Sequence, residues 1–156
     1  MSLTPLTHNS HLDGSALPSH LLDFDSSIYW PGDAKPLAVA RQRTRTLLEL
    51  WGLGYLVGDA TVVVNELVTN VFEHAEGPAL LQLSRMPHTL RVAVSDQVGF
   101  PVTMPEDVRH ISATDPGGRG LLIVAALSCE LECTVLRWGK CIAAELNVAM
   151  PSLIGR

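Results

Sequence analysis

The stretch of sequence that decides the fold is Val62-Val63-Val64-Asn65-Glu66-Leu67-Val68-Thr69-Asn70-Val71-Phe72-Glu73-His74-Ala75. Apolar residues recur at positions 63, 64, 67, 68, 71 and 72, a spacing typical of a helix with one buried face. Glu66, Asn70 and His74 stand four residues apart and therefore share one stripe of this helix. Such a stripe is either a solvated helix face or a place where a carboxylate, an amide and an imidazole meet a metal ion, a water and a phosphate together. The rest of the sequence decides between these two alternatives.

Length and composition indicate one globular domain with a substantial core. The chain has 156 residues, of which 47% are hydrophobic and 17% are charged. We expect a tail at 1–20, a single domain at 21–150 and a short tail at 151–156. No apolar run reaches the roughly 20 residues of a membrane-spanning helix, and the N-terminus does not resemble a signal peptide. The composition therefore predicts a cytoplasmic protein that does not bind membranes.

The charge pattern and the cysteines exclude two other classes of function. The net charge is −5, which argues against nucleic-acid binding through neutralised phosphates. Arg41, Arg43 and Arg45 form the only basic cluster, and their spacing predicts a solvated helix surface. Cys129 and Cys133 have the spacing of half a metal site, but no second ligand pair follows. The three cysteines are therefore expected to be reduced, buried thiols.

The remaining chain alternates between helical and strand-like patterns. Gly52 and Gly77 each end a predicted helix, and Asp59 is the expected N-cap of the second one. Two pairs of strand-like runs form predicted hairpins, the later one with its turn at Trp138-Gly139-Lys140. The expected order is a strand at 26–30, helices at 36–50 and from 59 to the Gly77-Pro78 break, strands at 79–85 and 89–95, a helix at 120–127, and strands at 130–137 and 141–148. This order predicts an α+β fold, a two-layer sandwich of helices on a mixed, mostly antiparallel sheet.

Two further segments carry chemistry. Val94-Ser95-Asp96-Gln97-Val98-Gly99 places an acidic residue at the end of a strand, before a glycine. Asp115-Pro116-Gly117-Gly118-Arg119-Gly120-Leu121 is a glycine-rich loop that opens a helix, where backbone N–H groups can face a phosphate. Each segment alone is equally typical of a tight turn. Both lie within or beside the long irregular stretch 96–120, and loops of that length are usually either functional lids or disordered.

Together and in this order, the three segments resemble the ATP-binding domain shared by gyrase, Hsp90, histidine kinases and MutL. Residues 65–75 resemble the asparagine box of that family, Val94-Ser95-Asp96 resembles the segment of its adenine-contacting aspartate, and residues 117–121 resemble its second glycine box. The resemblance extends over about residues 31–146. It is closest to the stand-alone branch of bacterial anti-sigma factor serine/threonine kinases.

The resemblance implies ATP and Mg²⁺ as ligands. Asn70 would bind the metal ion, which prefers oxygen ligands and keeps several waters. Glu66, one helical turn earlier, would orient or deprotonate the attacking hydroxyl, and Asp96 would accept a hydrogen bond from the adenine amino group. The other nucleotide contacts would come from His74, Gly99, Gly117, Gly118, Arg119, Gly120 and Leu121.

The run after Asp96 departs from the D-x-G-x-G turn of the family, because the first glycine is displaced to Gly99 and the second is absent. Three functions therefore stay open. The domain is a kinase that phosphorylates a serine of an anti-sigma factor antagonist, or a nucleotide-binding module that regulates a sigma factor or another signalling partner by binding alone, or a relative that no longer binds nucleotide. The kinases it resembles pair through their sheets and first helices, which leaves a homodimer open as well.

Overall fold

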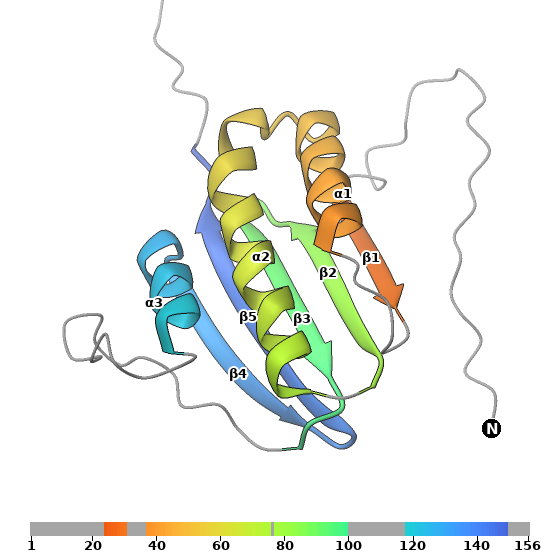
Figure 1. The fold of residues 1–156 in the computed structure, drawn as a ribbon. Coiled ribbons are helices and arrows are strands. Elements are labelled where there is room, and N and C mark those ends of the chain that lie inside the picture. Colours follow the sequence, from red (N-terminus) through yellow and green to blue (C-terminus); the bar gives the residue numbers. More distant parts are fainter. Residues whose placement is uncertain (1–23, 31–36, 76, 100–117, 150–156) are drawn as a thin grey trace, which may run out of the picture.

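The computed structural model describes residues 24–30, 37–75, 77–99 and 118–149. Over these residues, five strands form one sheet and three α-helices cover one of its faces (Figure 1). The elements are β1 (Phe24–Trp30), α1 (Leu37–Leu50), the 3₁₀ turn η2 (Gly54–Leu56), α2 (Val57–His74), β2 (Ala79–Arg85), β3 (Thr89–Asp96), α3 (Gly118–Leu127), β4 (Glu130–Leu136) and β5 (Gly139–Asn147). The predicted tails at 1–20 and 151–156 and most of the predicted lid lie outside the described residues. No helix in the described part of the chain is both long and apolar enough to cross a membrane.

The sheet has the strand order β1-β2-β3-β5-β4. All four strand pairings in the described residues are antiparallel. The chain leaves β3 and, after α3, returns to the sheet in β4 at the edge, so that β5 lies between β3 and β4. This arrangement confirms the predicted α+β sandwich of helices on a mostly antiparallel sheet, although none of the described pairings is parallel. It also places the end of β3 beside the start of β5.

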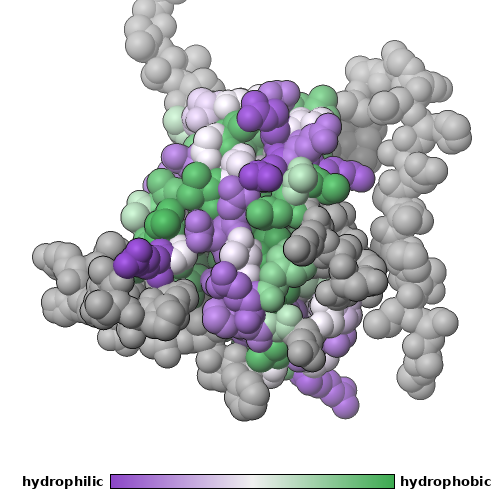
Figure 2. Space-filling view, in the orientation of Figure 1, coloured by the Kyte–Doolittle hydropathy of each residue, from purple (hydrophilic) through white to green (hydrophobic). Residues whose placement is uncertain are grey.

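The core lies between the helical layer and one face of the sheet. Alternate residues of β3 (Leu90, Val92 and Val94) point to this face and are buried, as the twofold period of a strand requires. Each such apolar side chain contributes about 1.5–3 kcal/mol when it leaves water. The outer surface of the helices mixes hydrophilic and hydrophobic residues (Figure 2). From α2 the core receives Ala60, Val63, Val64, Leu67, Val68 and Val71.

The end of α1 was predicted correctly, whereas the start of α2 was not. Gly52 ends α1 as expected: its φ of 70° is left-handed, and the bonds Leu53 N–H to Leu48 O and Gly52 N–H to Glu49 O close a Schellman motif. Asp59, in contrast, is not the N-cap of α2. The turn η2 runs directly into α2, which begins at Val57 and places Asp59 in the first helical turn. There its charge favours the helix through the macrodipole and not through a capping bond.

The predicted turn of the last hairpin is also wrong. Gly139 and Lys140 belong to β5, and the turn is limited to Arg137 and Trp138. Lys140 is in phase with Ile142 along the strand, so both side chains face the helices. The side chain expected in solvent at a turn is therefore buried, with 4% of the residue exposed.

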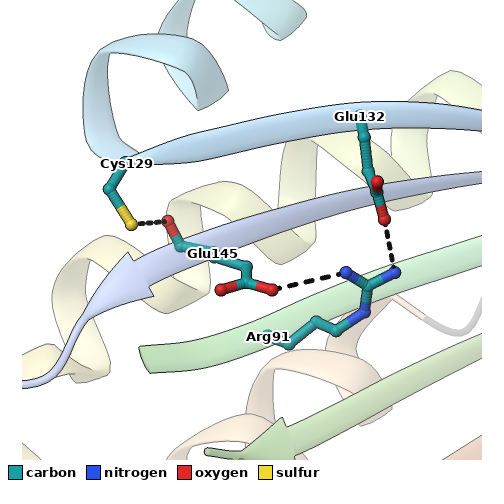
Figure 3. Close-up of polar contacts among 4 residues, drawn as sticks. All are labelled: Arg91, Cys129, Glu132 and Glu145. Carbon is teal, nitrogen blue, oxygen red and sulfur yellow. Dashed lines mark hydrogen bonds and ion pairs between the residues drawn. The ribbon is translucent and has the colours of Figure 1, made fainter. Parts of the chain in front are cut away.

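The opposite face of the sheet carries a polar network that joins three strands (Figure 3). Arg91 of β3 lies between two carboxylates, with Nη2 2.7 Å from Glu132 Oε1 and Nη1 3.5 Å from Glu145 Oε1. Partial burial alone would lower the pKa of Arg91, but the hydrogen bond to Glu132 and the nearby negative charges raise it above its ordinary value. Cys129 lies at the edge of this region, where its thiol donates to Glu145 O. It is exposed, and Cys133 and Cys141 are only half-buried, so the prediction of buried thiols is wrong, although all three cysteines are free as expected.

Candidate functional site

A pocket lies between α2, α3 and the adjoining ends of β3 and β5. Among the described residues its walls are mostly apolar, and four polar side chains reach it. An apolar pocket with a few convergent polar groups is the usual form of a small-molecule site. The apolar lining is Leu67, Val71, Val94, Leu121 and Ile142, and the polar lining is Asn70, His74, Asp96 and Lys140.

The three residues of the predicted helix stripe do not all line the pocket. Asn70 and His74 stand on successive turns of α2, and both line the pocket. The His74 side chain is more than half exposed, and its Nε2 is 3.8 Å from Glu73 Oε2. Glu66, one turn earlier, instead lies against α3.

The contact between Glu66 and α3 depends on a glycine. A Cβ at Gly120 would lie only 2.6 Å from Glu66 Oε2. The absence of a side chain at position 120 therefore gives the Glu66 carboxylate room beside the first turn of α3. A negative charge near a helix N-terminus is favourable, which helps to hold the carboxylate in this position.

Asp96 is the most completely enclosed polar residue of the predicted set, with 3% of the residue exposed. Its Oδ1 accepts the backbone N–H of Val98 at 2.8 Å, an Asx turn that fixes the carboxylate at the end of β3. Lys140, its partner in register on β5, places Nζ 2.9 Å from Oδ1 and 2.8 Å from Oδ2. The two opposite charges form a buried pair at the floor of the pocket.

Lys140 is the one polar residue of this lining that was not predicted from the sequence. The signal that identifies it is the period of β5: extending the inward positions Leu146, Ala144 and Ile142 by one more step reaches Lys140. A Cβ at position 139 would collide with the backbone carbonyl of Asp96. Because glycine has no Cβ, β5 can begin this close to the end of β3.

Of the remaining predicted residues that the structure describes, Leu121 alone belongs to the pocket lining. Leu121 lines the pocket, whereas Gly118 and Arg119 form the start of α3, where Arg119 is exposed. Gly99 is exposed and does not belong to the lining, and Gly117 lies outside the described residues. The structure thus brings Asn70, His74, Asp96 and Leu121 together, and the roles assigned to them stay predictions.

A divalent cation would find few protein ligands here. The described residues contain no cluster of three or more His, Cys, Asp or Glu side chains able to hold a metal ion. In the pocket, Asn70 offers one amide oxygen, while the Asp96 carboxylate is already paired with Lys140. That donor set fits Mg²⁺, which is commonly bound by one or two protein groups, several waters and the phosphates of a substrate.

The described residues form a small two-layer fold with a pocket between its helices and its sheet. A family model described as a histidine kinase-like ATPase domain matches residues 31–144, and the chain therefore belongs to that family. The matched range contains every lining residue of the pocket. Among curated proteins, no match was found.

Proposed function

We propose that the pocket binds ATP together with Mg²⁺. The observation that carries this proposal is that Asn70 and Asp96, taken from separate sequence motifs, line one pocket in a histidine kinase-like ATPase domain. A carboxylate and an amide at two places in a mostly apolar pocket suit a ligand with a flat heterocycle at one end and phosphates at the other.

The orientation of the nucleotide follows from the polar groups. Asp96 lies on the floor of the pocket, at the end of β3, and would accept a hydrogen bond from the adenine amino group. Asn70 would bind Mg²⁺ together with the phosphates, and His74 is the neighbouring polar group on the same helix. Leu121 belongs to the first turn of α3 and lines the pocket, which supports a role for the backbone N–H groups of that turn in binding the phosphates.

We further propose that the bound ATP phosphorylates a serine of a partner protein, an anti-sigma factor antagonist. The serine oxygen would form a bond to the γ-phosphorus while the bond from that phosphorus to the β–γ bridging oxygen breaks, which releases ADP. Glu66 would take the proton of the serine hydroxyl. Phosphoryl transfer depends mainly on positioning and charge neutralisation, so a small domain with one general base can perform it.

Transfer of label from γ-labelled ATP to the candidate antagonist tests this reaction. Glu66→Gln keeps the size of the side chain beside Gly120 and removes the base. Transfer should fall about 100-fold or more, the usual contribution of a general base, while MgATP affinity changes by less than about threefold. Glu49→Gln is the matched control, since Glu49 is exposed on α1 and should leave transfer unchanged. Full turnover by the Glu66→Gln protein would contradict the role of Glu66.

A second function is favoured by the segment after Asp96. This segment lacks the family's glycine turn, and Gly99 lies apart from the pocket lining. The domain would then hold ATP without turning it over and regulate a sigma factor or another signalling protein by binding. Label on a partner serine excludes this function, whereas saturable ATP binding without any transfer supports it.

A further inference from the structure

The buried pair of Asp96 and Lys140 keeps hydrogen-bonding capacity for a ligand. A carboxylate has about four lone-pair sites, and an ammonium group has three N–H donors. Among the described residues, Oδ1 of Asp96 accepts from both Val98 N and Lys140 Nζ, whereas Oδ2 accepts from Nζ alone. Nζ has no partner other than these two oxygens in the described part of the chain. One acceptor site on Oδ2 and one donor on Nζ therefore remain side by side.

We propose that Lys140 is a base-reading residue that donates a hydrogen bond to N1 of adenine while Asp96 Oδ2 accepts one from the 6-amino group. This inference rests on the proposed function, since it needs ATP in the pocket. The Watson–Crick edge of adenine carries one donor, the amino group, directly beside one acceptor, N1. The free acceptor and donor of the pair have the complementary order.

The opposite charges of Asp96 and Lys140 support a joint role of the two residues in binding adenine. A lone carboxylate buried at the floor of an apolar pocket would carry a large desolvation cost, and Lys140 compensates it at a contact distance of 2.8 Å. Because both groups are held in the protein before a ligand arrives, the base would meet donors and acceptors that are already oriented.

The same pair also discriminates against guanine. In the pose that matches adenine, guanine would place its O6 acceptor against Asp96 Oδ2 and its N1–H donor against Lys140 Nζ. Both hydrogen bonds would be replaced by an acceptor facing an acceptor and a donor facing a donor, so ATP should bind more tightly than GTP.

Calorimetric titrations of the unaltered protein with three nucleotides test the inference. In 1-deaza-ATP a C–H group replaces N1 and the amino group stays. We expect 1-deaza-ATP and GTP each to bind about tenfold or more weakly than ATP, the usual effect of losing a hydrogen bond to a charged group or of burying an unpaired one. The control nucleotide is 7-deaza-ATP, which is altered on the other edge of the base and should bind within about threefold of ATP.

Lys140→Met supplies the protein side of the test, because the variant keeps an extended side chain and loses the donors. ATP and 1-deaza-ATP should then bind with equal, weakened affinity. If this variant does not fold, as judged by circular dichroism, the titrations of the unaltered protein decide alone. Equal binding of ATP and 1-deaza-ATP, or of ATP and GTP, by the unaltered protein overturns the inference and leaves ATP binding standing. Failure of ATP itself to bind overturns the proposed function and the inference together.

Discussion

The carboxylate of Glu66 lies directly against Gly120, and this contact links the middle of α2 to the first turn of α3. The family resemblance assigns these two residues to separate motifs, a catalytic helix and a phosphate-binding loop. Their contact means that a change at Gly120 acts on Glu66, even though no side chain at position 120 is available for chemistry.

Gly120→Ala is therefore expected to separate stability from phosphoryl transfer. Alanine favours a helix over glycine by about 0.5–1 kcal/mol, but its methyl group displaces the Glu66 carboxylate. Transfer should fall about tenfold or more, the size of effect that a shift of about 1 Å in a catalytic group can produce, without a loss in thermal stability. Gly58→Ala is the matched control, since Gly58 also lies in a helix and has open space around its Cβ position. Equal transfer by both variants would refute the positioning role of Gly120.

Gly139→Ala should destabilise the fold. The added methyl group would collide with the backbone of Asp96, which cannot move without disturbing the β3–β5 pairing. We expect a loss of at least about 2 kcal/mol in the free energy of unfolding, measured by urea denaturation. Gly54→Ala, in open space and without a positive φ, should cost less than about 1 kcal/mol. A loss at Gly139 no larger than that at Gly54 would show that the strands tolerate the methyl group.

The two ion-pair sites on opposite faces of the sheet should differ strongly in their effect on stability. Asp96→Asn leaves the buried Lys140 charge without its counter-charge, and such losses cost about 3–5 kcal/mol. Glu132→Gln alters a pair whose side chains are 32% and 43% exposed, where water and salt screen the interaction, so its cost should stay below about 1 kcal/mol. Urea denaturation of both variants measures the difference. Similar losses for the two would mean that Lys140 finds another partner or loses its charge at little cost.

Most of the fold was predictable because its strongest signals are local. The period of 3.6 in α2, the glycine that ends α1 and the alternation in β2 and β3 each depend on neighbouring residues, and the structure has these elements close to the expected bounds. The start of α2 was not predicted correctly, because η2 continues into the helix without any side-chain cap for the sequence to reveal.

The candidate site was predictable only where one motif contained the residues. Asn70 and His74 follow from a single helix, and Asp96 follows from the end of one strand. The pairing of Asp96 with Lys140 depends on the register of two strands that are separated along the chain by α3 and β4. The local sequence pattern at Gly139 and Lys140 predicted a turn instead. A lysine beside a glycine is typical of a solvated turn, and only the backbone approach of β5 to Asp96 shows why this one is buried.

The most direct test of the proposed function is a calorimetric titration of the protein with MgATP, repeated with Asn70→Ala and with Asn147→Ala. We predict one saturable site in the unaltered protein and about tenfold or more weaker binding after the Asn70 change, because Asn70 would lose its contact with the metal ion and phosphates. Asn147→Ala removes an exposed amide at the opposite end of β5 and should bind MgATP as the unaltered protein does. The absence of saturable binding, or equal affinity in the Asn70→Ala variant, would contradict the assignment of this pocket to ATP.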